Sequence, residues 1–120
     1  MIFTSALRSL FVALPLCVAA LAQTPEQLDF FEKKVRPVLV KNCQGCHNSK
    51  MKAAALDLST VAGFITGGQS GPVIAKDQPE SSRLLKVIGY EENVKMPPTG
   101  KLKPEELADL TAWVKTGAPW

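Results

Sequence analysis

The sequence predicts an all-α protein, and three observations support this prediction. Apolar residues recur at helical spacing in separate segments that begin at prolines or capping residues. No segment shows the alternation of apolar and polar residues that is typical of strands. Stretches rich in glycine, proline and small polar residues separate the helical segments. We therefore expect three to four short helices joined by long loops.

The first helix is predicted to begin at Thr24 and to end near Asn42. Thr24 suits the N-cap, Pro25 suits the first helical position, and Gln27 lies where it completes a capping box. Pro37 lacks a backbone donor, so we expect a kink there. The apolar stripe of this helix has helical spacing and consists of Leu28, Phe31, Val35 and Val38.

The middle of the chain is predicted to be mostly loop, with two short helical pieces. Residues 43–78 are rich in Gly, Ser and Asn, and we expect a short helical turn near residues 59–65. Residues 67–72 read as a glycine-rich loop. A second helix is expected from Pro79 to just before Gly89.

The last helix has the strongest signal. An extended loop at residues 96–100 precedes it, because each proline there disfavours a helical residue before it. Pro104 suits the first position, Glu105 and Glu106 suit the first turn, and Gly117 suits the C-terminal stop. Its apolar stripe consists of Leu107, Leu110, Trp113 and Val114.

Residues 1–22 are predicted to be a secretory signal peptide, which leaves residues 23–120 as one domain. Arg8 is the only charge in the segment, and an apolar run of about 14 residues after it ends in a small-x-small cleavage pattern. An uncleaved anchor is disfavoured because the run is shorter than the roughly 20 residues that span a membrane. A lipoprotein acylated at Cys17 is disfavoured because the residue before this cysteine is large.

The composition restricts the class of protein. The 120 residues are 46% hydrophobic and 21% charged, which is typical of a single globular domain. The net charge of +3 is small and scattered, so we expect no nucleic-acid partner. Residues 23–120 contain no apolar stretch of membrane-spanning length. The single histidine excludes any metal site that needs two histidines from this chain.

Cys43, Cys46 and His47 form the pattern C-x-x-C-H, which is the attachment signature of a c-type haem. Two thioether bonds join the cysteine sulfurs to the vinyl groups of the haem, and the following histidine points its imidazole at the iron. Export fits this chemistry, because covalent attachment takes place outside the cytoplasm. The motif therefore predicts one covalently attached haem c with His47 as an axial ligand.

Three other interpretations of this motif are weaker. A disulfide between Cys43 and Cys46 would close a very small loop and stabilise the fold little. A thioredoxin-like redox pair needs a βαβ context that the sequence lacks. A zinc site needs four ligands, and the adjacent residues Cys46 and His47 cannot easily both reach one tetrahedral ion.

Met96 is predicted to be the second axial ligand of the iron. No second histidine exists, and a methionine sulfur is the remaining strong haem ligand. Met51 follows His47 so closely that it should stay on the same side of the haem. Met96 lies far downstream in a proline-rich loop, which lets the chain reach the opposite face. The alternative, that Met96 only fills the core, suits a methionine in such a loop poorly.

At these residues the chain resembles a class I cytochrome c, and more narrowly the planctomycete-type cytochrome c domain. The likeness covers most of residues 28–120; the haem motif is specific and the other matching runs support it. These runs are VRPVL at 35–39, LDL at 56–58, GGQSGPVI at 67–74, PESSRLL at 79–85, MPP at 96–98 and TAWVKTGAPW at 111–120.

The resemblance implies a small cytochrome c-like fold whose helices and long loops wrap around one covalent haem. It implies His47 as the proximal ligand and Met96 as the distal ligand. It also implies that the first and last helices cross beside the haem, with Phe31 and Trp113 packed there. One departure is notable: many class I cytochromes have a proline soon after the motif, whereas Asn48 follows here. The partner of the His47 Nδ1 atom is therefore unassigned.

Other residues are also expected near the haem. Leu84, Leu85 and Ile88 share one face of the second helix and are predicted to line the pocket. Arg83 is a candidate partner for a haem propionate, although it also suits a solvated helix face. The loop at residues 67–72 is a candidate cradle for the haem edge.

These features predict a periplasmic or otherwise exported mono-haem cytochrome that transfers single electrons to and from redox partner proteins. Ligands on both faces of the iron favour this role over bond-making chemistry. The sequence contains no catalytic constellation, so we do not expect an enzyme. Two alternatives remain: an enzyme or sensor with a labile Met96, and a haem-stabilised recognition or structural module of a larger exported protein.

Overall fold

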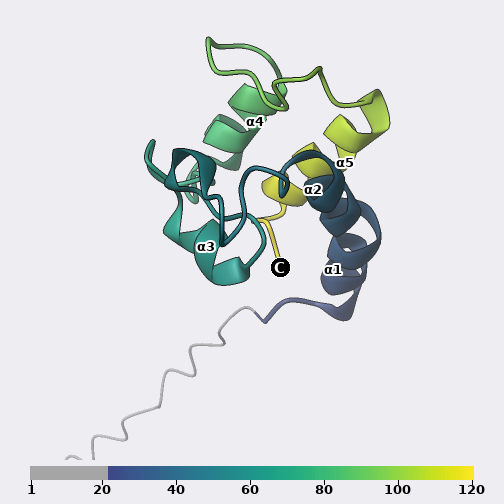
Figure 1. The fold of residues 1–120 in the computed structure, drawn as a ribbon. Helices are drawn as coiled ribbons and strands as arrows, with labels where there is room; N and C mark the ends of the chain where they lie inside the picture. Colours follow the sequence, from purple (N-terminus) through teal and green to yellow (C-terminus); the bar gives the residue numbers. More distant parts are fainter. Residues whose placement is uncertain (1–21) are drawn as a thin grey trace, which may run out of the picture.

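The computed structural model describes residues 22–120, and these residues form a helical fold with long connections (Figure 1). The predicted signal peptide at residues 1–22 lies, except for its last residue, outside them. The described part contains no strand, only an isolated bridge between Gly68 and Gly71, so the predicted all-α, cytochrome c-like class is confirmed. The helical elements are α1 (Pro25–Phe30), η1 (Phe31–Val35), α2 (Arg36–Asn42), η2 (Ala53–Ala55), α3 (Val61–Thr66), η3 (Pro79–Ser81), α4 (Arg83–Ile88) and α5 (Pro104–Lys115).

The first helical run begins as the sequence predicts. The Thr24 hydroxyl accepts a hydrogen bond from the Gln27 backbone at 3.2 Å, and the Gln27 side chain accepts one from the Thr24 backbone at 2.9 Å. This reciprocal pair is the expected capping box. Elements α1, η1 and α2 then continue without a break to Asn42, so one capped end starts a helix that leads directly into the C-x-x-C-H motif.

Pro37 changes the helix in the turn that precedes it rather than by a simple kink at its own position. The Arg36 N–H donates to the carbonyl of Phe31, five residues back, so η1 is a wide π-helical turn. A proline ring collides with the carbonyl four residues before it and offers no N–H. The wide turn directly before Pro37 therefore accommodates the proline within a continuous helix.

The predicted helix from Pro79 to Gly89 is wrong as a single element. It is split at Ser82, whose ψ of 137° is extended, into η3 and α4. The Ser82 side chain is fully buried, and its hydroxyl accepts a hydrogen bond from the Ala75 N–H at 2.9 Å. This tertiary contact fixes the serine outside the helical region and starts α4 at Arg83.

Aromatic side chains join the first and last helical runs. Phe31 and Trp113 are in contact, with ring centroids 5.7 Å apart, as the resemblance implies. The chain after α5 turns back into the centre of the fold (Figure 1), where the Trp113 indole donates to the Pro119 carbonyl at 2.7 Å. Gly117 permits this reversal with a φ of 93°, which confirms it as the stop of α5. Phe64 and Trp120 complete the cluster.

None of the helices within residues 22–120 has the length and apolar character that crossing a membrane requires.

Candidate haem-binding site

A cavity of about 440 Å³ opens between the C-x-x-C-H motif, the loop at residues 67–73, helix α4 and the loop before α5. This volume falls in the range of pockets that hold cofactors and other small molecules. Cys43, Cys46, His47 and Met96 all line it. The apolar side chains of its walls include Leu56, Leu58, Val73, Leu84, Val87 and Ile88.

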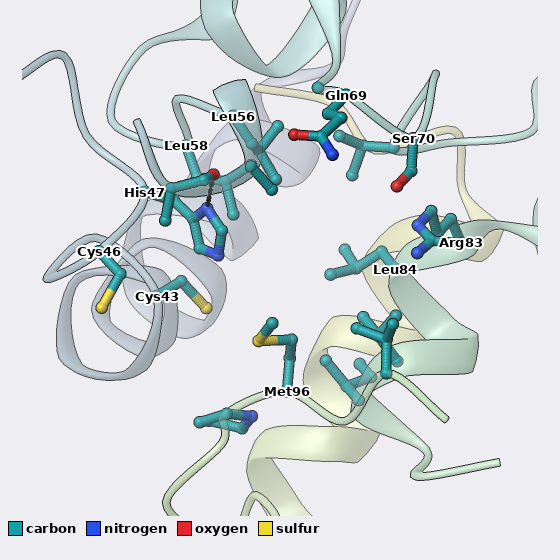
Figure 2. A pocket seen from close by; sticks show the side chains of 18 of the residues that line it. Cys43, Cys46, His47, Leu56, Leu58, Gln69, Ser70, Arg83, Leu84 and Met96 are labelled. Atoms are coloured by element: carbon teal, nitrogen blue, oxygen red, sulfur yellow. Dashed lines mark hydrogen bonds between the residues drawn. The ribbon is translucent and has the colours of Figure 1, made fainter. Parts of the chain in front are cut away.

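The end of α2 folds the motif so that its three functional side chains reach the same cavity. The Cys43 N–H donates to the Leu39 carbonyl at 2.9 Å, which continues the helical pattern. The N–H groups of Cys46 and His47 then both donate to the Cys43 carbonyl, at 3.3 Å and 3.0 Å. The resulting turn brings both sulfurs and the imidazole to one wall (Figure 2).

His47 has a defined partner that the sequence did not identify. Its Nδ1 atom lies 2.9 Å from the carbonyl oxygen of Ala53. A carbonyl only accepts, so Nδ1 carries the proton and Nε2 keeps its lone pair for a metal. Such a second contact fixes the ring orientation of a metal-binding histidine. The Ala53 carbonyl therefore fixes the His47 ring in this chain, which has no proline directly after its motif.

An unusual turn presents that carbonyl to His47. Lys52, Ala54 and Ala55 have positive φ values of 43°, 54° and 57°, which residues other than glycine rarely adopt. The turn is tied back to the motif, because the Ala53 N–H donates to the Cys46 carbonyl at 3.0 Å. Strained backbone of this kind is concentrated at functional sites.

The carboxylate of Asp57 stabilises the next part of this wall through hydrogen bonds to two serines. Its carboxylate accepts hydrogen bonds from the Ser59 N–H at 2.8 Å, from the Ser59 hydroxyl at 2.5 Å and from the Ser49 hydroxyl at 2.7 Å. The hydrogen bonds from Ser59 and Ser49 lower the pKa of Asp57 below its usual value. The Leu58 N–H donates to the His47 carbonyl at 3.0 Å, so the segment after the motif is closed on itself.

Met96 reaches the cavity from another wall. Its N–H donates to the Val87 carbonyl at 2.9 Å, which attaches the loop before α5 to helix α4. Figure 2 draws the Met96 side chain inside the cavity, on a segment separate from that of His47. Met51, the other methionine of the described residues, is 62% exposed and does not line the cavity.

The residues of α4 that the sequence predicts near a haem are placed in different ways. Arg83, Leu84 and Ile88 line the cavity. Leu85 does not; it is half-buried and packs against the hydrophobic core from another side of the short helix. Arg83 lies with Gln69 and Ser70, across the cavity from the two cysteines (Figure 2). The cavity thus has a sulfur-bearing end and a polar end.

The geometry bears on the other interpretations of the cysteines. Cys43 and Cys46 are both free, so they do not form a disulfide. Burial raises the pKa of the Cys43 thiol to about 11. Within residues 22–120, no cluster of three or more His, Cys, Asp or Glu side chains is arranged to hold a metal ion.

These residues fit a haem that is joined to the chain by two thioether bonds. The cavity is mainly apolar, the two thiols lie on one side of it, and the His47 imidazole and the Met96 thioether enter it from separate walls. The fold and the site define a small all-α protein of the cytochrome c type.

A family model described as Planctomycete cytochrome C matches residues 43–100, a span that includes both the haem motif and Met96. The match covers just under half of the chain, and it confirms the resemblance to the planctomycete cytochrome c domain that the sequence shows. This likeness indicates a covalently bound haem c and a role in haem-based electron transfer. Neither the curated proteins nor the solved structures gave a match to this chain.

Proposed function

We propose that this protein is a periplasmic mono-haem cytochrome that carries single electrons between redox partner proteins, with His47 and Met96 as the axial ligands of the iron. The observation that carries the proposal is the position of His47 and Met96 on separate walls of one apolar cavity that both cysteines also line. A haem supplies reversible one-electron chemistry when it is bound.

Each residue of the site has a distinct task in this proposal. Cys43 and Cys46 hold the cofactor by thioether bonds, so it cannot dissociate. The Ala53 carbonyl keeps the His47 ring in one orientation and in one tautomer. Met96 would supply a soft sulfur ligand to the iron, which would raise the potential and leave no open site for oxygen or peroxide. This ligand set favours electron transfer over enzymatic chemistry.

The two ends of the cavity support one orientation of the cofactor. In a haem the vinyl groups and the two propionates lie toward opposite edges of the ring. Attachment at Cys43 and Cys46 would therefore leave the propionates to be held at the polar end of the cavity. Arg83 and Ser70 there offer a cation and a hydroxyl donor to these carboxylates.

The periplasmic location and the redox partners are part of the same proposal. The predicted signal peptide at residues 1–22 directs export, and haem attachment at C-x-x-C-H takes place outside the cytoplasm. A single C-x-x-C-H motif supports one haem per chain. A carrier without catalytic residues must exchange its electron with other proteins, so we expect partner proteins on both sides of its reaction.

An absorption spectrum of protein expressed with the c-type maturation machinery tests the proposal. We expect one haem per chain that survives denaturation, and a weak near-infrared band from methionine-to-iron charge transfer. Met96→Ala should abolish this band and retain the haem. Met51→Ala is the matched control, because Met51 is exposed and lies outside the cavity.

The possible outcomes separate the competing functions. No covalent haem would overturn the proposal as a whole. If the parent protein binds haem but lacks the methionine band, Met96 does not occupy the sixth position of the iron. This result would favour an enzyme or sensor. A parent protein with the band that exchanges no electrons with small cytochromes would favour a structural or recognition module.

A further inference from the structure

The loop that carries Met96 is attached at two points, once to helix α4 itself and once to Tyr90, which follows the end of that helix. On one side, the Met96 N–H donates to the Val87 carbonyl at 2.9 Å. On the other side, the hydroxyl of Tyr90 donates to the carbonyl of Pro97. Residues 91–95 are all exposed, and the other contacts of the loop with α4 lie near its start: the Glu91 N–H donates to the Lys86 carbonyl at 3.3 Å, and Lys86 pairs with Glu92 at 3.8 Å.

We propose that Tyr90 is a positioning residue that holds Met96 over the haem iron through its hydrogen bond to the Pro97 carbonyl. The inference rests on the proposed function, because it assigns a support to the distal ligand. Tyr90 does not line the cavity, so it acts on the iron only through the loop.

The surroundings of this hydrogen bond indicate that it contributes to the position of the loop. Pro97 is buried and Tyr90 is half-buried, so water cannot easily replace the hydroxyl as a donor. The other donor to the Pro97 carbonyl is the Gly100 N–H, at a long 3.4 Å within the same loop. Only the tyrosine therefore joins this carbonyl to the chain at the end of α4.

The backbone of Tyr90 indicates that its side chain has a role. Its φ is 59°, in the left-handed region where glycine or asparagine is the usual residue at the end of a helix. A tyrosine at such a position is strained. The conformation turns the chain at the end of α4 and directs the ring toward the loop, where the Lys95 ammonium lies 5.9 Å from the ring centroid. The ring and the hydroxyl thus both contact the segment around Met96.

Loss of the hydroxyl should loosen the distal ligand without removing it. A single hydrogen bond of this kind corresponds to a change of about threefold to tenfold in an opening equilibrium. Tyr90→Phe should therefore raise the rate at which imidazole binds to the ferric iron by about this factor, because imidazole binds only after Met96 leaves. The methionine charge-transfer band should also be lost at a lower concentration of added imidazole.

Thr111→Val is the matched control. The Thr111 hydroxyl also donates to a backbone carbonyl from a half-buried position, to Leu107 at 2.7 Å, but on helix α5 and away from the cavity. Both variants and the parent would be compared as holoproteins by imidazole-binding kinetics, the near-infrared band and thermal unfolding. A purely structural role for the Tyr90 hydroxyl would lower the unfolding temperature of both variants and leave their imidazole kinetics equal.

The outcomes distinguish this inference from the proposed function. Faster imidazole binding in Tyr90→Phe, with Thr111→Val unchanged, supports the positioning role. Kinetics of Tyr90→Phe that match the parent or the control overturn it and leave His47/Met96 ligation intact. A parent protein without the methionine band removes the proposed ligation, and the role of Tyr90 falls with it.

Discussion

The wall that carries His47 and the loop that carries Met96 are held in different ways. His47 lies in a closed network in which its ring, its carbonyl and the turn after it are all hydrogen-bonded to neighbouring backbone. Met96 lies at the end of an exposed loop and is held there by one hydrogen bond to Val87 of α4 and by the hydrogen bond from Tyr90 to Pro97. The difference predicts that the histidine side of the site is rigid and that local opening starts on the methionine side.

The largest expected effect comes from disturbing the rigid wall. An alanine at Gly63 would place its Cβ 2.5 Å from the Asp57 carbonyl oxygen and 2.7 Å from the Asp57 Cβ. The wall must then shift, and we expect Gly63→Ala to lower the free energy of unfolding of the holoprotein by about 1–3 kcal/mol. Denaturant unfolding measures this change.

Gly45→Ala provides the control for this prediction. An added Cβ at Gly45 meets no atom within 4 Å, and its φ is not in the left-handed region. The free energy of unfolding of Gly45→Ala should stay close to that of the parent protein. Equal stabilities for the two variants would show that the packing of α3 against Asp57 does not hold the wall.

The second prediction compares two amides with similar hydrogen bonds. The Leu58 N–H donates to the His47 carbonyl at 3.0 Å, and the Met96 N–H donates to the Val87 carbonyl at 2.9 Å. After correction for intrinsic rates, we expect the Met96 amide to exchange with deuterium at least about tenfold faster, because its loop opens locally. Equal protection factors would contradict the difference between the two regions.

Much of the fold could be predicted because the signals at helix ends are local. The capping box of Thr24, Pro104 at the start of α5 and Gly117 after it depend only on nearby residues, and all three lie as expected. The split of the second helix at Ser82 could not be predicted, because it depends on a hydrogen bond with a distant backbone group, the N–H of Ala75.

The candidate site could also be predicted only in part from the sequence. Residue identity and spacing were enough to select Cys43, Cys46, His47 and Met96, which line one cavity. The support of the histidine could not be identified, because every residue has a carbonyl and the sequence does not reveal which one points at His47. The role of Tyr90 depends in turn on a loop conformation that becomes known only once Pro97 is placed beside α4.

The smallest expected effect is confined to acidic solution and concerns Asp57. Because hydrogen bonds from Ser59 and Ser49 lower its pKa in the folded state, the carboxylate stabilises the fold above the pKa of the unfolded chain. This contribution is lost as the pH falls through the lowered pKa of the folded state. Asp57→Asn should therefore flatten the dependence of unfolding free energy on pH in the acidic range.

Asp29→Asn is the comparison that isolates the role of the wall. Asp29 is an exposed residue of α1 that pairs with Lys33 at 2.9 Å, so its removal takes away a charge without touching the site. Unfolding of the parent and both variants would be followed from neutral to acidic pH. Only the Asp57 variant should lose part of the acid dependence, because only its carboxylate joins the segment after the haem motif to the start of α3. If unfolding free energy depends on pH in the same way in all three proteins, the backbone hydrogen bonds hold the wall around His47. The charge of Asp57 then does not contribute to its stability.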